Sequence, residues 1–201
     1  MLRVGLTGGL ASGKTFVGHA LAELGCHFIE ADDLGHQVLL PDGEAYGAVV
    51  REFGPGILNS DKFVDRRKLG ALVFEQPALL EKLNRLVHPP VGARQARMIA
   101  EIAARDPHAI VVVAAAILVE TGSYKRFDRL IVVTCTLEQQ IERAMKRGPY
   151  TREEVLARLS RQLPLEEKVR LADYVIDTSG AKENTLAQVS TVFQSLRSLS
   201  V

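Results

Sequence analysis

The segment from Gly8 to Thr15 constrains this chain more than any other. It reads Gly-Gly-Leu-Ala-Ser-Gly-Lys-Thr, which matches the pattern G-x-x-x-x-G-K-[ST]. In this pattern the glycines let backbone N–H groups surround a phosphate, the lysine reaches the β- and γ-phosphates, and the final hydroxyl contacts Mg²⁺. The apolar run Leu2–Leu6 indicates a strand before the loop, and apolar residues at helical spacing follow Lys14. The sequence therefore predicts a phosphate site at the N-terminus of a helix.

The amino-acid composition and net charge indicate which kinds of molecule the protein is expected to bind. The 201 residues are 47% hydrophobic and 24% charged, which is typical of a globular enzyme with one domain or one domain with inserted lobes. The net charge is +1, so no overall attraction to nucleic acid or membranes is expected. Tyr and Phe are few and are not interleaved with the basic residues, which argues against base stacking. We expect small-molecule substrates, no nucleic acid and no membrane.

The two cysteines, Cys26 and Cys135, lie in or beside apolar, strand-like runs. Without C-x-x-C spacing, and without a histidine pair at metal spacing, neither a disulfide framework nor protein-ligated zinc is expected. No apolar run reaches the length of a membrane span, and the chain starts on a strand rather than on a signal-peptide pattern. The cytoplasm is the expected location.

Apolar, β-branched runs alternate with helical patterns along the chain. Short strands that are buried on both faces and separated by helices indicate a parallel sheet with helices on each side. The expected strands are Leu2–Leu6, Cys26–Glu30, Ala109–Ala114, Arg129–Thr134 and Tyr174–Asp177, and the expected helices span residues 13–24, 91–105, 137–147 and 183–199.

Two segments do not fit a minimal core of this kind. The first contains Gly54-Pro55-Gly56 and His88-Pro89-Pro90 with short helical patterns between them, which indicates an inserted helical lobe. The second is basic on one face, and Thr151 with Glu154 forms a capping box that starts a helix there. We therefore expect a core of residues 1–32, 91–142 and 165–201, a lobe of residues 33–90 and a lid of residues 143–164.

An acidic cluster, Glu30-Ala31-Asp32-Asp33, follows the second expected strand. Ligands of open parallel sheets bind beyond the carboxyl ends of the strands, so this cluster should face the phosphate loop. Asp32 could accept a hydroxyl proton, orient an acceptor, or help bind Mg²⁺ through water. The alternative is structural, because Asp32 or Asp33 could start the next helix as an N-cap.

Arginines in the expected lid are the natural partners of a transferring phosphoryl group. Arg143 and Arg147 are four residues apart and share one helical face, and guanidinium groups make bidentate contacts to phosphate oxygens. A closing lid would bring such charges onto the reacting group and exclude water. A solvated basic face is the alternative. For His88, a structural and a catalytic role stay equally open.

Several separated stretches together resemble the dephospho-coenzyme A kinase family, a member of the nucleoside-monophosphate-kinase-like P-loop group. The resemblance covers nearly the whole chain, and its acidic Ala-Asp, Asp-Arg-x-x-Leu and His-Pro motifs are more specific than the phosphate loop. It rests on Gly5–Thr15, Glu30-Ala31-Asp32, Val64–Leu69, Val87-His88-Pro89, Ile117–Glu120, Arg143 with Arg147, Arg158 with Gln162, and Ala172–Asp177.

The resemblance implies ATP-dependent phosphorylation of the ribose 3′-hydroxyl of dephospho-coenzyme A, the last step of coenzyme A biosynthesis. It implies that Asp32 lies near the acceptor hydroxyl as its base. The insertion would be the acceptor lobe, where Arg66 and His88 match family positions. The later basic segment would be the lid that carries Arg143 and Arg147.

This chain departs from the family pattern at five positions. Ala11 stands where glycine is frequent, and Glu30 replaces an aspartate. Phe16 lacks a hydroxyl that could contact the α-phosphate, so Lys14, Thr15 and backbone N–H groups must contribute more. Ala114 stands near the end of the third strand, where the family often has an acid, and Thr178 replaces an asparagine.

Taken together, the sequence predicts an α/β, three-layer P-loop kinase fold with a five-stranded parallel sheet, a helical acceptor-binding lobe and a lid. ATP and Mg²⁺ are the expected cofactors, and the chain is expected to be a monomer or a small homo-oligomer. Two alternatives stay open: another small-molecule P-loop kinase, of the nucleoside monophosphate or shikimate type, and a nucleotide-dependent switch that binds a protein. The expected donor-binding residues are Gly8, Gly9, Ala11, Ser12, Gly13, Lys14, Thr15 and Phe16, with Thr15 toward the metal.

Overall fold

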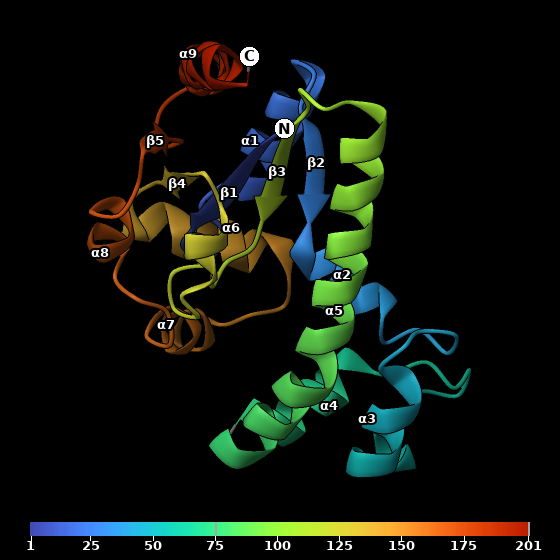
Figure 1. Ribbon diagram of the computed structural model, residues 1–201. Helices are drawn as coiled ribbons and strands as arrows, with labels where there is room; N and C mark the ends of the chain where they lie inside the picture. Colours follow the sequence, from blue (N-terminus) through green and yellow to red (C-terminus); the bar gives the residue numbers. More distant parts are fainter. Residues whose placement is uncertain (75, 201) are drawn as a thin grey trace. The chain divides into compact units, whose positions relative to one another are not determined.

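The computed structural model describes residues 1–74 and 76–200 and divides the chain into two compact units (Figure 1). One unit comprises Met1–Glu30 and Ile102–Val201, and the other comprises Ala31–Glu101. The first unit holds the sheet, and the second is built from helices.

All five strands of the sheet run parallel, in the order β2-β3-β1-β4-β5. Leu6 in the central strand β1 lies opposite Ala114 on β3 and Ile131 on β4, which sets the register. The prediction of a five-stranded parallel sheet is therefore confirmed, with strand bounds close to those expected. The strands are β1 (Leu2–Gly8), β2 (His27–Glu30), β3 (Ile110–Ala114), β4 (Arg129–Thr134) and β5 (Tyr174–Asp177).

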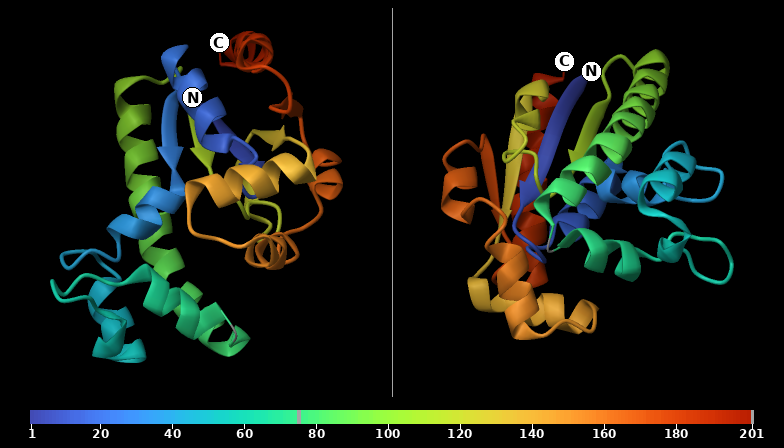
Figure 2. Two further views of the ribbon diagram at one scale, coloured as in Figure 1. Left: turned by 180° about the vertical axis from the view of Figure 1, so that it is seen from behind. Right: turned by 90° about the horizontal axis from the view of Figure 1, so that it is seen from below.

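The sheet is buried on both faces, as alternate residues of β4 show. Ile131 and Val133 belong to one cluster, to which α1 (Lys14–Glu23) and α9 (Lys182–Leu199) contribute, and α1 lies over the strands in the view from behind (Figure 2). Leu130 and Val132 belong to a second cluster, against which α8 (Leu165–Val169) packs. Because successive strand residues point to opposite faces, this alternation requires helices on both sides.

The second unit has its own apolar core. The helices α2 (Ala31–Gln37), α3 (Tyr46–Phe53) and α4 (Arg66–Phe74) and the short 3₁₀ turn η1 (Pro55–Ile57) follow one another in the chain. Buried residues of α3, η1 and α4 form one cluster with two residues from the connection between α2 and α3, so this segment buries much of its own hydrophobic surface. The cluster consists of Val38, Ala45, Val49, Ile57, Leu69 and Val73.

The helix expected over residues 91–105 begins earlier than predicted, because α5 (Pro77–Arg105) passes through both Pro89 and Pro90 over 29 residues. A proline inside a helix removes a hydrogen bond and crowds the preceding turn, which bends a helix without ending it when both halves are packed. Leu86 and Val91, on either side of Pro89 and Pro90, pack against the core of the second unit. Figure 1 shows α5 changing direction along its length.

The segment expected to form the lid, residues 143–164, contains the end of one helix and the whole of the next. α6 (Leu137–Arg147) starts at a capping box of Thr136 and Gln139, so residue 143 lies inside this helix. α7 (Arg152–Leu159) begins after Thr151, whose side chain accepts from Glu154 N, and the predicted capping box is confirmed. A further 3₁₀ turn, η2 (Ser123–Arg126), precedes β4.

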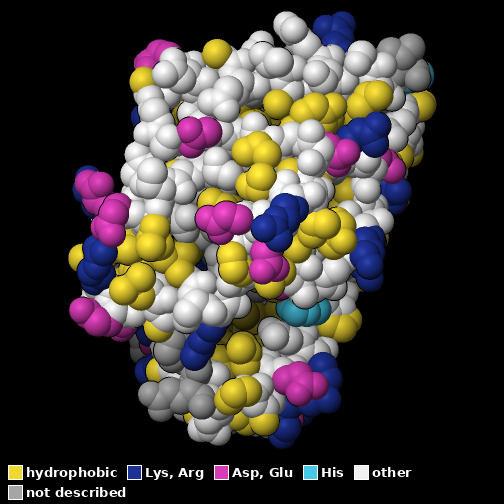
Figure 3. Space-filling model, turned by 90° about the vertical axis from the view of Figure 1, so that its left-hand side faces the viewer, with side chains coloured by type: hydrophobic (Ala, Val, Ile, Leu, Met, Phe, Trp, Pro, Cys, Tyr) yellow, Lys and Arg dark blue, Asp and Glu magenta, His cyan; other side chains and the backbone are white. Residues whose placement is uncertain are grey.

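Charged side chains of both signs lie on the surface, and the two cysteines lie in the interior. Acidic and basic side chains are interspersed on the face shown in Figure 3, where hydrophobic side chains form small groups. Both thiols are buried and unpaired, and burial raises the pKa of Cys26 to about 12 and also raises the pKa of Cys135. Within residues 1–74 and 76–200, no helix has the length and hydropathy to cross a membrane.

Truncation of a core valine tests this arrangement. Val112 is 0% exposed between the helical layers, whereas Val175 on β5 is 43% exposed. We expect Val112→Ala to lower the free energy of unfolding by roughly 2 kcal/mol, because it removes buried methyl groups and leaves a cavity. The same change at Val175 should cost much less. Urea unfolding measures both, and equal losses would contradict the two-faced burial.

Candidate active site

A backbone carbonyl requires glycine at Gly8 of the phosphate loop, and at Gly9 the absence of a side chain leaves room for Gln140. A Cβ atom at Gly8 would lie 2.4 Å from the carbonyl oxygen of Val133, and one at Gly9 would lie 2.7 Å from Gln140 Oε1. Gly13, just before α1, has a φ of 96°, which a side chain would strain. The loop therefore lies directly against the end of β4 and the side of α6.

Ala11 adopts a left-handed backbone conformation, with a φ of 54°. This conformation costs an L-residue roughly 1–2 kcal/mol, which explains why glycine suits the position. Here the methyl group is buried together with Ile141, Ala144 and Val155. That packing offsets the strain and ties the phosphate loop to α6 and α7.

The two polar side chains that end the loop motif have defined partners. Lys14 Nζ donates to the carbonyl oxygens of Gly9, at 2.9 Å, and Gly8, at 3.3 Å. Thr15 Oγ1 donates to Glu30 Oε1 at 2.5 Å. Glu30, the last residue of β2, is thus brought into the site although the expected site residues did not include it. Its place in the acidic cluster at the strand end is the signal that points to it.

Ser12 and Phe16 are both turned toward the protein interior. Ser12 is 0% exposed, and its Oγ has no hydrogen-bond partner among the described residues. Phe16 packs against the core beneath the sheet. The aromatic ring that replaces a hydroxyl in this chain therefore contributes to packing.

Thr178 connects three elements around the loop. Its Oγ1 lies 2.8 Å from Ser12 O and 3.1 Å from Thr134 O, and both carbonyl oxygens can accept a hydrogen bond from this hydroxyl. Arg143 donates to Thr178 Oγ1 at 3.0 Å and to Thr178 O at 2.7 Å. Thr178 was expected only as a replacement for asparagine, and its role in joining loop, β4 and α6 was not foreseen.

The two predicted lid arginines lie in different surroundings. Arg143 is half-buried on α6 and is held by Thr178, whereas Arg147, one turn later, is exposed. The guanidinium of Arg143 opposes the burial that raises the pKa of Cys135. The two arginines therefore differ in exposure although both lie on α6.

The remaining predicted residues belong to the second unit. Asp32 and Asp33 are exposed in the first turn of α2, where carboxylates also interact favourably with the helix dipole. Arg66 and His88 are exposed on α4 and α5. Asp65, just before α4, accepts from Arg67 N and Lys68 N, so this residue of the Asp-Arg motif serves as a helix cap.

The donor atoms near the loop suit a hard cation that also binds phosphate. Thr15 and Glu30 present a hydroxyl and a carboxylate, which are ligands that Mg²⁺ accepts. Over residues 1–74 and 76–200, no group of three or more His, Cys, Asp and Glu could hold a metal. An ion at this place would therefore need oxygen atoms from its substrate as well.

Methyl addition at the loop glycine should disrupt the site. In Gly8→Ala the new Cβ clashes with a backbone carbonyl that cannot rotate away, so we expect at least tenfold weaker ATP binding and a loss of roughly 2 kcal/mol in stability. Gly92→Ala on α5, where a Cβ meets nothing within 4 Å, should keep or raise stability. Calorimetric titration and urea unfolding test the pair. Unchanged ATP affinity in Gly8→Ala would refute the role of the loop.

Known proteins share this fold and these motifs over nearly the whole chain. The profile of the dephospho-CoA kinase family matches residues 2–184. The dephospho-CoA kinase of Syntrophus aciditrophicus is 38% identical over 98% of this chain and 83% of its own, and that of Carboxydothermus hydrogenoformans is 41% identical over 95% and 92%.

Among solved structures, TT1252 from Thermus thermophilus superposes with a TM-score of 0.79 at 30% identity, covering 97% of each chain. A match of this kind extends over the sheet and the helical insertion alike. The chain therefore belongs to the dephospho-CoA kinase family and is a kinase that transfers phosphate to dephospho-CoA, in the final step of coenzyme A biosynthesis.

Proposed function

We propose that the protein transfers the γ-phosphoryl group of ATP to the ribose 3′-hydroxyl of dephospho-CoA, with the donor on the phosphate loop and Asp32 acting on the acceptor. The observation that carries the proposal is the convergence of Lys14, Thr15 and Glu30 at the start of α1. A helix N-terminus with a lysine and a hydroxyl beside it favours a polyphosphate.

Donor binding falls to the loop from Gly8 to Phe16. Lys14 now donates to two loop carbonyls, and the same ammonium can exchange them for oxygens of the β- and γ-phosphates. Backbone N–H groups at the start of α1 add to this attraction. Because Phe16 packs inward, the α-phosphate must be bound by backbone groups.

Mg²⁺ is the proposed metal, held by Thr15 and by phosphate oxygens of ATP. Glu30 accepts a hydrogen bond from the Thr15 hydroxyl, which turns a lone pair of the hydroxyl oxygen outward. The carboxylate also adds negative charge near the ion. The ion would neutralise charge on the transferring phosphoryl group.

Asp32 is the proposed base for the acceptor hydroxyl. It follows β2 by two residues, at the carboxyl end of the sheet, and its carboxylate is exposed and therefore accessible to a substrate. Arg66 and His88, exposed on the helical unit, are the proposed acceptor contacts. Arg143 and Arg147 are the proposed cationic contributors on the donor side, with residues 143–164 as the moving segment.

A side-by-side phosphorylation assay tests the proposed reaction. The purified chain is incubated with ATP and Mg²⁺ and with dephospho-CoA, AMP or shikimate in turn. We expect transfer to dephospho-CoA alone, with the product phosphorylated at the 3′ position. Transfer only to AMP or shikimate would refute the proposed acceptor, and hydrolysis of ATP without any transfer would favour a switch protein.

The two neighbouring aspartates of α2 give a matched test of the base. Asp32→Asn should lower kcat by about a hundredfold or more, because general base catalysis contributes on that order, while ATP affinity stays within about twofold. Asp33→Asn removes the same charge one residue later and should have little effect. Steady-state kinetics and ATP titration separate the outcomes. A change confined to ATP-Mg²⁺ affinity would assign Asp32 to the metal instead.

A further inference from the structure

Lys168 is a charged residue that the proposed chemistry does not use, and its side chain is completely buried on α8. Its Nζ lies 2.6 Å from Glu120 Oε1 and donates to Ala116 O at 2.9 Å. Such partners are needed because a buried ammonium loses its hydration. A buried ion pair generally adds little to stability, since desolvation offsets the attraction. This pair lies beside the chain segment that follows α7, where Glu120 makes a further contact.

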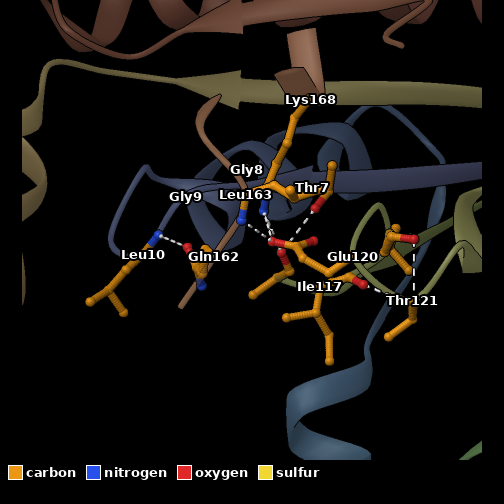
Figure 4. A network of polar contacts seen from close by, with 12 residues as sticks. Thr7, Gly8, Gly9, Leu10, Ile117, Glu120, Thr121, Gln162, Leu163 and Lys168 are labelled. Carbon is orange, nitrogen blue, oxygen red and sulfur yellow. Dashed lines mark hydrogen bonds and ion pairs between the residues drawn. The ribbon is translucent and has the colours of Figure 1, made fainter. Parts of the chain in front are cut away.

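Glu120 also holds the chain that returns from α7. Its Oε1 accepts a hydrogen bond from the backbone N of Leu163 at 3.2 Å, while its Oε2 is buried without a partner among the described residues. Figure 4 shows Lys168 and Leu163 converging on this carboxylate. Glu120 thus fixes the point where the basic segment rejoins the core.

The residue before Leu163 contacts the phosphate loop itself. Gln162 Oε1 accepts from Leu10 N at 3.0 Å, so one peptide of the loop is oriented by a side chain from the end of the basic segment (Figure 4). On the opposite side of the network, Ala116 O also accepts from Thr7 Oγ1 at 3.3 Å, directly before Gly8. The network therefore contacts the phosphate loop at Leu10 and the end of β1 just before the loop at Thr7.

We infer that Gln162 is a positioning residue for phosphoryl transfer, held against the phosphate loop by the hydrogen bond that Glu120 Oε1 accepts from Leu163 N. The inference rests on the proposed function, in which the loop binds the donor phosphates. Gln162 fixes the orientation of the Leu10 peptide. The hydrogen bond of the next residue, Leu163, to Glu120 holds Gln162 in place at the end of the segment that follows α7. Misalignment of a reacting group by about 1 Å can cost on the order of a hundredfold in rate, so even a small displacement matters.

The kinetic signature follows from which loop atoms are affected. Leu10 precedes the part of the loop, Gly13 to Thr15, that starts α1 and carries the lysine and the hydroxyl. Loss of the Gln162 contact should therefore leave ground-state ATP binding nearly intact and act on the transition state. A lower kcat with little change in KM for ATP is expected.

Gln162→Met isolates the contact, because methionine has a similar length but no amide oxygen. We expect kcat to fall roughly tenfold or more, KM for ATP to stay within about twofold, and amide hydrogen exchange at Leu10 to accelerate. Gln194→Met, on the exposed side of α9, is the matched control and should change none of these. Faster exchange with an unchanged kcat would overturn the positioning role, and unchanged exchange would overturn the contact.

Two double variants separate positioning from structural support. Glu120→Gln with Lys168→Met removes both charges but keeps an oxygen for Leu163 N, whereas Glu120→Leu with Lys168→Met removes that oxygen as well. We expect the first double variant to keep most of its kcat and the second to lose as much kcat as Gln162→Met. Adding Gln162→Met to the second double variant should cause no further loss. Equal rates in the two folded double variants would overturn the role of the Glu120 oxygen that accepts from Leu163 N.

An exposed ion pair provides the control for these double variants. Hydrogen exchange tests the contact of Gln162 with Leu10 independently of the proposed reaction. Asp128→Leu with Arg3→Met makes comparable replacements at an exposed ion pair beside the start of β1, where the rate should not change. Urea midpoints establish folding, and if a double variant does not fold, the Gln162→Met comparison decides alone. If the unaltered protein fails to phosphorylate dephospho-CoA, the proposed function fails, yet exchange at Leu10 still tests the contact.

Discussion

The close approach of the phosphate loop to β4 and α6 is the constraint on which the rest of the site depends. A side chain at Gly8 would collide with Val133 O, and one at Gly9 would collide with Gln140. Because the backbone can come this near, Thr178 can join Ser12, Thr134 and α6 by hydrogen bonds from a single position. The start of α1 is thereby fixed, and with it the direction in which its N–H groups and Lys14 point.

Charged side chains beside the loop hold this arrangement by orienting other residues. Glu30 orients the hydroxyl of Thr15, and the buried Glu120–Lys168 pair holds the return from α7. In both cases a charged group acts on another residue that lies nearer to the substrate. Preorganisation of this kind lowers the reorganisation needed during phosphoryl transfer, since the dipoles are already aligned. The apolar contacts of Ala11 with α6 and α7 serve the same purpose through packing.

Much of the fold could be predicted because its signals are local. Apolar, β-branched runs predict strands β4 and β5. A capping box, whose partners are three residues apart, predicts the start of α7. The start of α5 at Pro77 was not predicted, because the expected helix began only after Pro89 and Pro90, whose apolar neighbours pack against the core of the second unit. The different surroundings of Arg143 and Arg147 could not be foreseen, because Thr178 is distant in the sequence.

By itself the sequence determined the chemistry that the site can hold: a loop for phosphate, an acidic strand end and a kinase family with its acceptor. These are properties of short motifs, in which neighbouring residues act through their own backbone. Tertiary structure alone decided that Glu30 serves Thr15, that Thr178 holds Arg143, and that Gln162 reaches Leu10. Each of these contacts joins residues far apart in the chain, so only the packing of the sheet and its helices could bring them together.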